Sequence, residues 1–321
     1  MAPDKTSLGP LTVISAIVPV YNEEGCLRQF HAELTSTLRS QPIRYEILYI
    51  DDGSTDGSAG ILHEFQAQDA AVAVVHMTRN FGHQTALTAG LELAKGDAVI
   101  TLDCDLQHPP ELILRLLAEW RAGAKVVHTV REETEDIGPL KKTASALFYR
   151  LINFLSSTPI RANAADFRLL DRQAVDMLKT MNERNRFLRG MIAWLGLAEV
   201  SVSFKAPKRA AGKSKYTWRK MLRMGADGIA SFSIQPLRLA LWLGLAVLSV
   251  NAVYATYVLH HYIFYNTLIQ GWASLILLMM FLGSSQLIML GVIGEYIGRI
   301  YEESKSRPLF LVRELRPHRL P

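Results

Sequence analysis

The chain has 321 residues and a formal net charge of +5, from 35 Lys and Arg residues against 30 Asp and Glu residues. This weak, mixed charge does not favour a nucleic-acid-binding protein, and the length allows one large domain or two modest ones. The hydrophobic fraction of 49% is ordinary for a globular protein. Its distribution is unusual, because residues 239–294 contain no Asp, Glu, Lys or Arg.

The two cysteines, Cys26 and Cys104, are far apart in the sequence and lack the spacing of metal ligands. We expect two buried free thiols in a reducing compartment. Residues 1–10 are polar, and the apolar run that follows is interrupted by Pro19 and has no basic segment before it. We therefore expect no signal peptide and an N-terminal part that stays in the cytoplasm.

The first 130 residues alternate between short apolar runs rich in β-branched residues and segments with helical spacing. Asn22 is expected to cap the first helix. Such alternation predicts an α/β domain with a mostly parallel sheet and helices on both faces. We expect strands at 13–20, 45–50, 72–77, 98–103 and 125–130, and helices at 22–38, 58–68, 80–95 and 109–120.

Polar clusters follow the predicted strands at 21–24, 51–56 and 103–107, and Arg131 follows the fifth strand. In parallel sheets ligands bind at the carboxyl ends of the strands. Each cluster alone is also compatible with ordinary turn chemistry. Together they predict a binding site at this edge of the sheet.

Beyond residue 131 the pattern changes to charged and basic segments. We expect a loop at 132–136, helices at 140–155 and 183–197, a strand at 199–205 and a basic loop at 206–217. Residues 217–233 combine apolar and basic side chains at helical spacing, which fits a helix lying on an anionic membrane surface. A surface helix packed on the domain is the alternative.

The uncharged stretch fits two membrane-spanning helices, at about 237–259 and 271–294, since one span needs about 20 apolar residues. Lys and Arg residues flank the two predicted helices and are missing from the segment that joins them, residues 260–270. This distribution predicts that both termini lie in the cytoplasm. A buried soluble hairpin would need a large partner surface. Four glycines predict close helix contact in a homo-oligomer, of which a tetramer is one form: Gly283, Gly291, Gly294 and Gly298.

Asp103 and Asp105 end the fourth predicted strand, where alternation would send both side chains to the same side. Two converging carboxylates indicate a hard divalent cation, Mg²⁺ or Mn²⁺, with Gln107 completing or supporting its ligands. Asp51 and Asp52 end the second predicted strand. They are expected to accept hydrogen bonds from a nucleoside or, alternatively, to form an Asx-type turn.

Seven ordered segments closely resemble the polyprenyl-phosphate glycosyltransferases of glycosyltransferase family 2, and within them the bactoprenol glucosyltransferases with two C-terminal transmembrane helices. The dolichol-phosphate mannose synthases are more distant relatives. The resemblance covers residues 12–305 and implies a GT-A fold, a nucleotide-sugar donor, inversion at the anomeric carbon and a metal. The segments are VPVYNEE, DDGSTDGS, RNFGHQTALTAG, DCDLQHPPE, ADFRLLD, ERNRFLRGMIAWLG and RAAGKSKYTWRKM.

The resemblance also implies roles for single residues. Asp166 matches the position usually proposed as the catalytic base, and Arg209 and Lys215 match a loop that closes over phosphates. The nucleoside would be held by Pro19, Tyr21, Glu23, Asp51 and Asp52, and the metal and diphosphate by Asp103, Asp105 and Gln107. Small departures from the family pattern are Cys104, where Ala is frequent, and Ala162 to Ala165, where Gly often precedes the Asp.

A lipid phosphate is already largely ionised at neutral pH, so a strong general base is less necessary than screening between two anions. We therefore expect Asp166 mainly to orient the acceptor, an arginine or the donor sugar. The acceptor phosphate is expected to be bound by basic residues: Arg131, Lys141, Lys142, Arg186 and Arg189, with Arg209 and Lys215 adding screening.

The sequence thus predicts an enzyme of the bacterial cytoplasmic membrane that transfers glucose from UDP-glucose to undecaprenyl phosphate. We expect a catalytic domain at 1–216, an interfacial helix at 217–235, a transmembrane hairpin at 236–298 and a basic tail at 299–321. A mannose or aminosugar donor with another nucleotide remains an alternative. A hydroxyl-acceptor polysaccharide synthase is disfavoured by having only two spans and no Q-x-x-R-W motif, and a non-catalytic nucleotide-binding scaffold would not need the metal pair.

Overall fold

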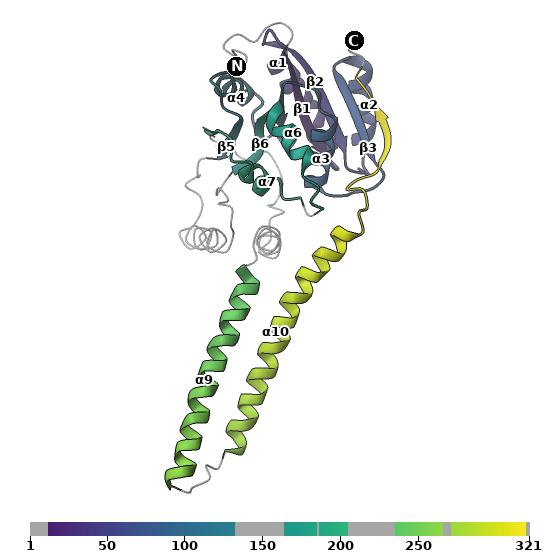
Figure 1. Cartoon of the computed structure of the whole chain (residues 1–321). Coiled ribbons are helices and arrows are strands. Elements are labelled where there is room, and N and C mark those ends of the chain that lie inside the picture. Colours follow the sequence, from purple (N-terminus) through teal and green to yellow (C-terminus); the bar gives the residue numbers. More distant parts are fainter. Residues whose placement is uncertain (1–11, 132–163, 185, 205–234, 266–270, 319–321) are drawn as a thin grey trace. The chain divides into compact units, whose positions relative to one another are not determined.

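The computed structural model describes residues 12–131, 164–184, 186–204, 235–265 and 271–318 (Figure 1). The described chain forms two compact units, one built around a sheet and one containing two long helices. The strands are β1 (Val13–Val20), β2 (Arg44–Asp51), β3 (Val72–Met77), β4 (Ala98–Thr101), β5 (Val126–Arg131), β6 (Ala164–Asp171), β7 (Glu199–Phe204) and β8 (Val312–Arg316). The helices are α1 (Glu24–Arg39), α2 (Ser58–Gln68), α3 (His83–Leu93), α4 (Leu112–Arg121), α6 (Arg172–Thr180), α7 (Leu188–Trp194), α9 (Gln235–Tyr265) and α10 (Trp272–Ser304).

The eight strands form one sheet in the order β7-β5-β6-β4-β1-β2-β3-β8. The centre is parallel, as expected, because β4, β1, β2 and β3 all run in the same direction. The sheet as a whole is mixed, since β6 runs antiparallel to β4 and β5, and β8 runs antiparallel to β3. The sequence pattern predicted neither of these antiparallel strands and did not predict α6.

Alternation along β1 divides its side chains between two layers of helices. Ile14, Ala16 and Val18 belong to the buried cluster that also contains the apolar faces of α1, α2 and α4. Ile17 points to the other face, where α3 packs on the sheet. Gly90 permits this close approach, because a Cβ atom there would lie 2.2 Å from the Ile17 side chain.

Some boundaries differ from the prediction. Asn22 does not cap α1: it adopts a left-handed backbone (φ 55°), and its side-chain oxygen accepts a hydrogen bond from the Thr55 backbone N–H at 2.8 Å. The fourth strand ends at Thr101, two residues before the first aspartate of the predicted metal pair. The helix expected at 183–197 is only the short α7, so Arg186 lies before it.

The C-terminal segment is part of the sheet domain and not a free basic tail, which corrects the expected boundary at residue 299. β8 covers the edge strand β3, with His76 opposite Glu314 in the register. His318 lies 3.2 Å from the buried carboxylate of Glu46, and Gln66 donates a hydrogen bond to the Pro317 carbonyl at 3.2 Å. The edge of β3, which would otherwise present unpaired backbone groups, is thereby paired.

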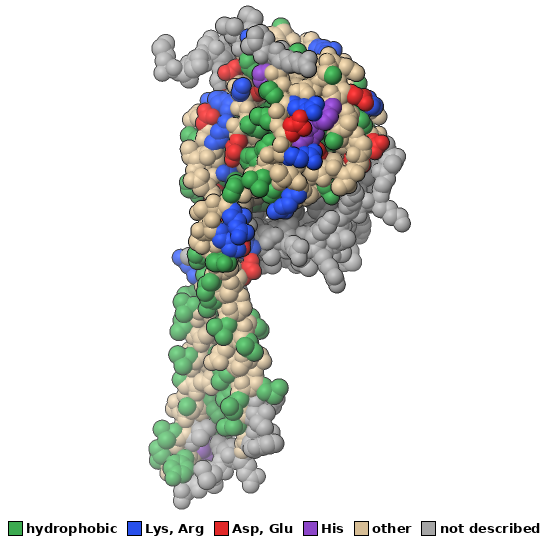
Figure 2. Space-filling view, turned by 90° about the vertical axis from the view of Figure 1, so that its right-hand side faces the viewer, with side chains coloured by type: hydrophobic (Ala, Val, Ile, Leu, Met, Phe, Trp, Pro, Cys, Tyr) green, Lys and Arg blue, Asp and Glu red, His purple; other side chains and the backbone are tan. Residues whose placement is uncertain are grey.

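The second unit contains the two apolar helices that the sequence predicted. Ala240–Phe264 and Leu278–Ser304 are each long and apolar enough to cross a membrane. Their apolar side chains are exposed within the described chain, as at Trp242 (67%) and Leu248 (65%), and Figure 2 shows hydrophobic groups along these helices. Added Cβ atoms at Gly283 and Gly291 would meet no atom within 4 Å, so these glycines are not needed for packing among the described residues.

Several expected elements lie outside the described residues. They are the loop at 132–136, the helix at 140–155, the basic loop at 206–217 and the amphipathic helix at 217–233. The expected phosphate ligands Lys141, Lys142, Arg209 and Lys215 lie there too.

His31 on α1 makes folding stability depend on pH. Its ring stacks on Phe65 with centroids 3.9 Å apart, and its Nδ1 lies 3.0 Å from the Tyr49 hydroxyl. Burial lowers the pKa of His31 to about 4. An unfolded histidine has a pKa of about 6.5. The neutral His31 ring therefore contributes its full stabilisation of the folded state above a pH of about 6.5. This contribution is lost as the pH falls from about 6.5 to about 4.

We expect the wild-type free energy of unfolding to fall over this range by about 2 kcal/mol from His31 alone, after discounting for its partial exposure. His31→Gln, which cannot titrate, should show a flatter dependence. Thermal unfolding of the full chain in detergent at a series of pH values measures the difference. Equal slopes for the two proteins would contradict this assignment.

Candidate functional site

A cavity of about 370 Å³ opens at the carboxyl ends of β1, β2 and β4. We call it the strand-end cavity. Residues from three of the predicted polar clusters line it, together with the segment around the start of α3. Its lining is Pro19, Val20, Tyr21, Glu23, Asp52, Asn80, Gly82, His83, Ala86, Asp103, Cys104 and Asp105. The prediction that these clusters meet at one edge of the sheet is confirmed.

Asp52 joins the loop after β2 to the loop before α3. Its two carboxylate oxygens accept hydrogen bonds from the backbone N–H groups of Phe81 (2.7 Å) and Gly82 (2.9 Å). Burial raises the pKa of Asp52, and the two N–H groups oppose that shift. Asp52 thus fixes the wall of the strand-end cavity.

Asp51, expected to bind the nucleoside, does not line the strand-end cavity. It is 1% exposed, and its oxygens meet His76 Nδ1 at 2.7 Å and accept from the Ser54 backbone N–H at 2.9 Å. Burial would raise the pKa of Asp51, but these hydrogen bonds outweigh it and lower the pKa. Successive residues of a strand point to opposite sides, which separates Asp51 from Asp52.

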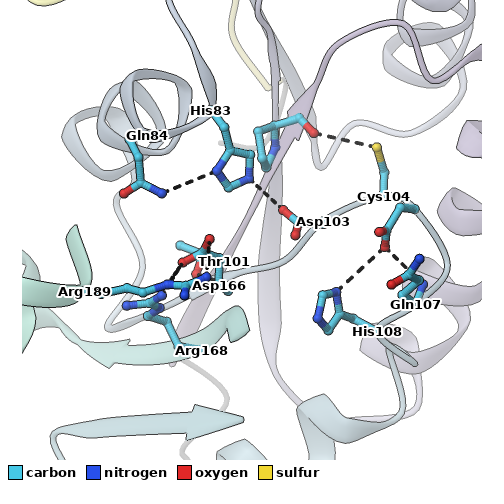
Figure 3. Close-up of polar contacts among 12 residues, drawn as sticks. His83, Gln84, Thr101, Asp103, Cys104, Gln107, His108, Asp166, Arg168 and Arg189 are labelled. Atoms are coloured by element: carbon cyan, nitrogen blue, oxygen red, sulfur yellow. Dashed lines mark hydrogen bonds and ion pairs between the residues drawn. The ribbon is translucent and has the colours of Figure 1, made fainter. Parts of the chain in front are cut away.

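Asp103 and Asp105 both line the strand-end cavity, but in a loop and not on a strand. Strand alternation therefore does not explain their positions. Asp103 Oδ1 lies 2.8 Å from His83 Nε2, as Figure 3 shows. Burial would lower the pKa of His83, but the hydrogen bond and the negative charges of Asp103 and Asp166 outweigh it and raise the pKa.

A tight turn orients Asp105. Leu106 has a left-handed backbone (φ 58°), which is uncommon for a residue with a bulky side chain. This turn brings the Gln107 backbone N–H to 3.0 Å from Asp105 Oδ1. Gln107 therefore supports Asp105 through its backbone, and its side chain is not part of the cavity lining. Strained backbone of this kind is often found at functional sites.

Asp166 lies on β6, where its carboxylate is held by two arginines. Arg189 donates from Nε to Oδ1 and from Nη2 to Oδ2, both at 3.0 Å, and Arg168 donates to Oδ1. Burial would raise the pKa of Asp166, but the charges of Arg168 and Arg189 outweigh it and hold the pKa well below its usual range. The carboxylate is therefore ionised at neutral pH, with both oxygens engaged.

The side chain of His83 bonds Asp103 (Figure 3), and the charges of both Asp103 and Asp166 act on it. The next residue, Gln84, accepts a hydrogen bond from the Leu188 backbone N–H at 3.2 Å, which ties α3 to the start of α7. The sequence analysis had recognised the segment containing His83 but gave that residue no role, and it had not singled out Arg168. The i, i+2 spacing of Asp166 and Arg168 was a usable signal once a strand was assumed.

The two remaining described basic candidates behave differently from Arg189. Arg186 donates to the backbone carbonyls of Met181 (2.5 Å) and Glu183 (3.3 Å), and burial lowers its pKa. It thus does not join Arg189 on Asp166. Arg131 is the last residue of β5 and lies opposite Phe204 in the register.

Both cysteines are free, as expected, but they lie closer together than their sequence positions indicated. The sulfur atoms and the Glu23 carboxylate lie within 4.8 Å of one another. Its hydrogen bond with Cys26, together with burial, raises the pKa of the Cys104 thiol well above its ordinary value. A protonated thiol is a poor metal ligand, so this group does not compete with the carboxylates for a hard cation.

Comparison with known proteins finds similar sequences and folds. Residues 15–178 match the family model described as glycosyl transferase family 2. The chain is 41% identical over 300 residues to the uncharacterized glycosyltransferase YkcC of Bacillus subtilis, covering 94% of this chain and 93% of that one. It is 40% identical to the bactoprenol glucosyl transferase of Shigella phage SfX, covering 94% and 98%. The mannosyl-3-phosphoglycerate synthase of Rubrobacter xylanophilus, 20% identical, superposes with a TM-score of 0.45 over 67% of this chain and 71% of that one.

The chain belongs to glycosyltransferase family 2 and is a glycosyltransferase. Its mixed sheet with helices on both faces is the GT-A-like fold that the sequence predicted.

Gly53, next to Asp52, tests how tightly the wall of the strand-end cavity is built. It has φ 69°, and a Cβ atom there would lie 2.6 Å from the Arg79 carbonyl carbon. We expect Gly53→Ala to lower the free energy of unfolding by at least about 2 kcal/mol, because the residue is strained and the backbone must shift.

Gly60→Ala is the matched control, since a Cβ atom at this position in α2 meets nothing within 4 Å. It should be neutral or stabilising by up to about 1 kcal/mol. Denaturant unfolding of both variants measures the contrast, and similar stabilities would refute the steric argument.

Proposed function

We propose that this protein is an inverting glucosyltransferase that moves glucose from UDP-glucose to a polyprenyl phosphate, undecaprenyl phosphate in bacteria. The observation that carries the proposal is the strand-end cavity, where Asp103 and Asp105 meet the cluster around Tyr21 and Glu23. Support for the substrate class comes from relatives named bactoprenol glucosyl transferase that match over nearly their whole length.

The strand-end cavity has the composition of a nucleotide-sugar site. Tyr21 is 46% exposed and offers an aromatic face to a base, and Glu23 offers acceptors to hydroxyl or N–H groups. The backbone of Pro19 is fixed by its place at the end of β1, and its carbonyl faces the Cys104 thiol at 3.6 Å. We assign these residues and Asp52 to the nucleoside side of the donor.

The carboxylates fit a divalent metal. Asp103 and Asp105 supply hard oxygen ligands in one cavity, and the bond from His83 uses only one oxygen of Asp103. Bound Mg²⁺ or Mn²⁺ would neutralise the diphosphate as it leaves. The chain's own residues orient these ligands: His83 holds Asp103, and the Gln107 backbone holds Asp105.

Asp166 is proposed to position Arg189 and not to remove a proton. Its lowered pKa and its two arginine partners make it a weak base at neutral pH. A phosphate acceptor is largely ionised at that pH and does not require deprotonation. An oriented Arg189, with Lys141, Lys142, Arg209 and Lys215 from outside the described residues, would instead screen the repulsion between acceptor and donor.

We further propose that α9 and α10 cross the bacterial cytoplasmic membrane, with the sheet domain and both termini in the cytoplasm. The exposed apolar side chains of both helices support this, because water would solvate them poorly. The basic flanks support the orientation. A homo-oligomer remains a prediction from the glycine pattern alone.

The metal role of the aspartates is tested by Asp103→Asn and Asp105→Asn. Each should reduce formation of glucosyl polyprenyl phosphate by roughly 100-fold or more, because several kcal/mol of charge stabilisation is lost. Purified protein is incubated with Mg²⁺ or Mn²⁺, labelled UDP-glucose and undecaprenyl phosphate, and the lipid product is measured by mass.

Asp176→Asn is the control, since Asp176 lies on α6 outside the strand-end cavity and its side chain is 60% exposed. Full transfer by both site variants in the presence of a chelator would rule out the metal site. Product formed only from another labelled nucleotide sugar would assign a different donor.

The positioning role of Asp166 predicts non-additivity. Asp166→Asn and Arg189→Met should each lower kcat by about 10- to 100-fold, and the double variant should be no worse than the poorer single variant, because the pair acts as one unit. The pH profile of wild-type kcat should also show no ionisation of Asp166 between pH 5 and 9. The lower limit of this range lies about one unit above the usual pKa of an aspartate. Additive losses, or an acid limb removed by Asp166→Asn, would instead identify a general base.

A further inference from the structure

A second group of potential metal ligands lies outside the strand-end cavity, at the edge of the sheet formed by β3 and β8. His63 of α2, His76 of β3 and Glu314 of β8 place one ligand atom each within 4.8 Å of the other two. We call them the His–His–Glu cluster. Figure 2 faces the side of the sheet domain that carries α2 and β8, where histidine side chains lie beside acidic and basic ones.

The two imidazole rings point at the same spot. His63 Nε2 lies 2.8 Å from His76 Nε2, and the ring planes are nearly perpendicular. Glu314 is the direct partner of His76 in the β3–β8 register, so its side chain projects from the same side of the sheet. Two imidazole nitrogens from the consecutive elements α2 and β3 thus converge with a carboxylate from β8, which is distant in sequence.

The surrounding groups orient these three ligands as outer-shell partners do in metal sites. Asp51 Oδ2 lies 2.7 Å from Nδ1 of His76, which holds a proton on Nδ1 and leaves Nε2 with its lone pair directed at the cluster. Arg316 donates from Nε to Oε1 of Glu314 at 2.7 Å, which leaves Oε2 for coordination. A histidine backed by a buried carboxylate is a common arrangement in zinc proteins.

The local charge favours a cation. Asp51 and Glu314 contribute two negative charges and Arg316 contributes one positive charge. Imidazole nitrogen with a carboxylate is a donor set suited to Zn²⁺ more than to Mg²⁺.

We propose that His63, His76 and Glu314 bind Zn²⁺, with water as a fourth ligand, and that this ion fastens the C-terminal strand β8 to α2 and β3. In place of the proton shared between the two Nε2 atoms, the ion coordinates both rings. This Zn²⁺ site differs from the hard-cation site of Asp103 and Asp105 in its ligands and in its position. The proposal does not depend on the identity of the sugar donor or acceptor.

Binding of Zn²⁺ alone tests the site. Metal-stripped full-length protein without a polyhistidine tag is titrated with Zn²⁺ in detergent, with Mg²⁺ in millimolar excess to occupy the carboxylate site. We expect one Zn²⁺ per chain and a rise in the melting temperature. His63→Gln and Glu314→Gln should each weaken this binding by at least about 10-fold.

Glu33→Gln is the matched control, because Glu33 is exposed on α1 and belongs to neither site. Unchanged Zn²⁺ affinity in both cluster variants would overturn the proposal, and so would the absence of saturable binding by the wild type. Both altered side chains lie at the surface or partly so, and the melting curves of the metal-free variants verify that they fold.

Co²⁺ in place of Zn²⁺ identifies the ligands in the unaltered protein. Visible d–d bands without a thiolate charge-transfer band are expected for nitrogen and oxygen ligands. A strong thiolate band would place the ion at Cys26 and Cys104 and contradict the assignment. Limited proteolysis should also cut the chain after residue 304 more slowly with Zn²⁺ than without it in the wild type, and at equal rates in Glu314→Gln.

Discussion

The site depends on holding several carboxylates close together against their mutual repulsion. Glu23, Asp52, Asp103 and Asp105 line one cavity, and Asp166 lies near it. Carboxylates that share one cavity destabilise one another unless hydrogen bonds or cations compensate for their charges. Three of these acids receive different compensation: Asp52 accepts hydrogen bonds from backbone N–H groups, Asp166 from two arginines, and Asp103 lies beside a histidine.

This division of partners separates structural from chemical roles. Asp51 and Asp52 are neighbours in sequence, but one binds His76 inside the sheet domain and the other fixes the cavity wall. Asp166 was expected to be a base or an orienting residue, and its two arginine contacts favour orientation. A carboxylate that is already fully paired contributes by placing its partners, because moving it also moves their charges.

The centre of the fold was predictable because it is local. Each βα unit in residues 13–121 has a strand run followed by helical spacing, and the parallel order of β4, β1, β2 and β3 brings their carboxyl ends together. The strand-end clusters could therefore be placed before the structure was known. The choice between Asp51 and Asp52 as a lining residue could not, because it depends on which side of β2 each one faces.

The strands that the sequence pattern did not predict, β6 and β8, are held in the sheet by strands that are distant in the sequence. β6 inserts antiparallel between β4 and β5, and the Thr101 hydroxyl donates to the Asp166 carbonyl at 2.6 Å. Nothing within the ADFRLLD segment encodes those neighbours. β8 is similar: its alternating charged residues look like a solvated tail, and only pairing with β3 makes it a strand. Prediction from local pattern loses accuracy where backbone hydrogen bonds join residues that are tens to hundreds of positions apart.

The position of β8 constrains the membrane topology independently of the charged flanks. β7 precedes the apolar helices α9 and α10, and β8 follows them, yet both strands belong to the same hydrogen-bonded sheet. Strands of one sheet cannot lie on opposite sides of a bilayer, so the membrane spanning that we propose requires the chain between them to cross the bilayer an even number of times. Two described helices of sufficient length satisfy this requirement. With a single crossing, β8 could not pair with β3. Pairing at the sheet edge and spanning by both helices therefore support each other.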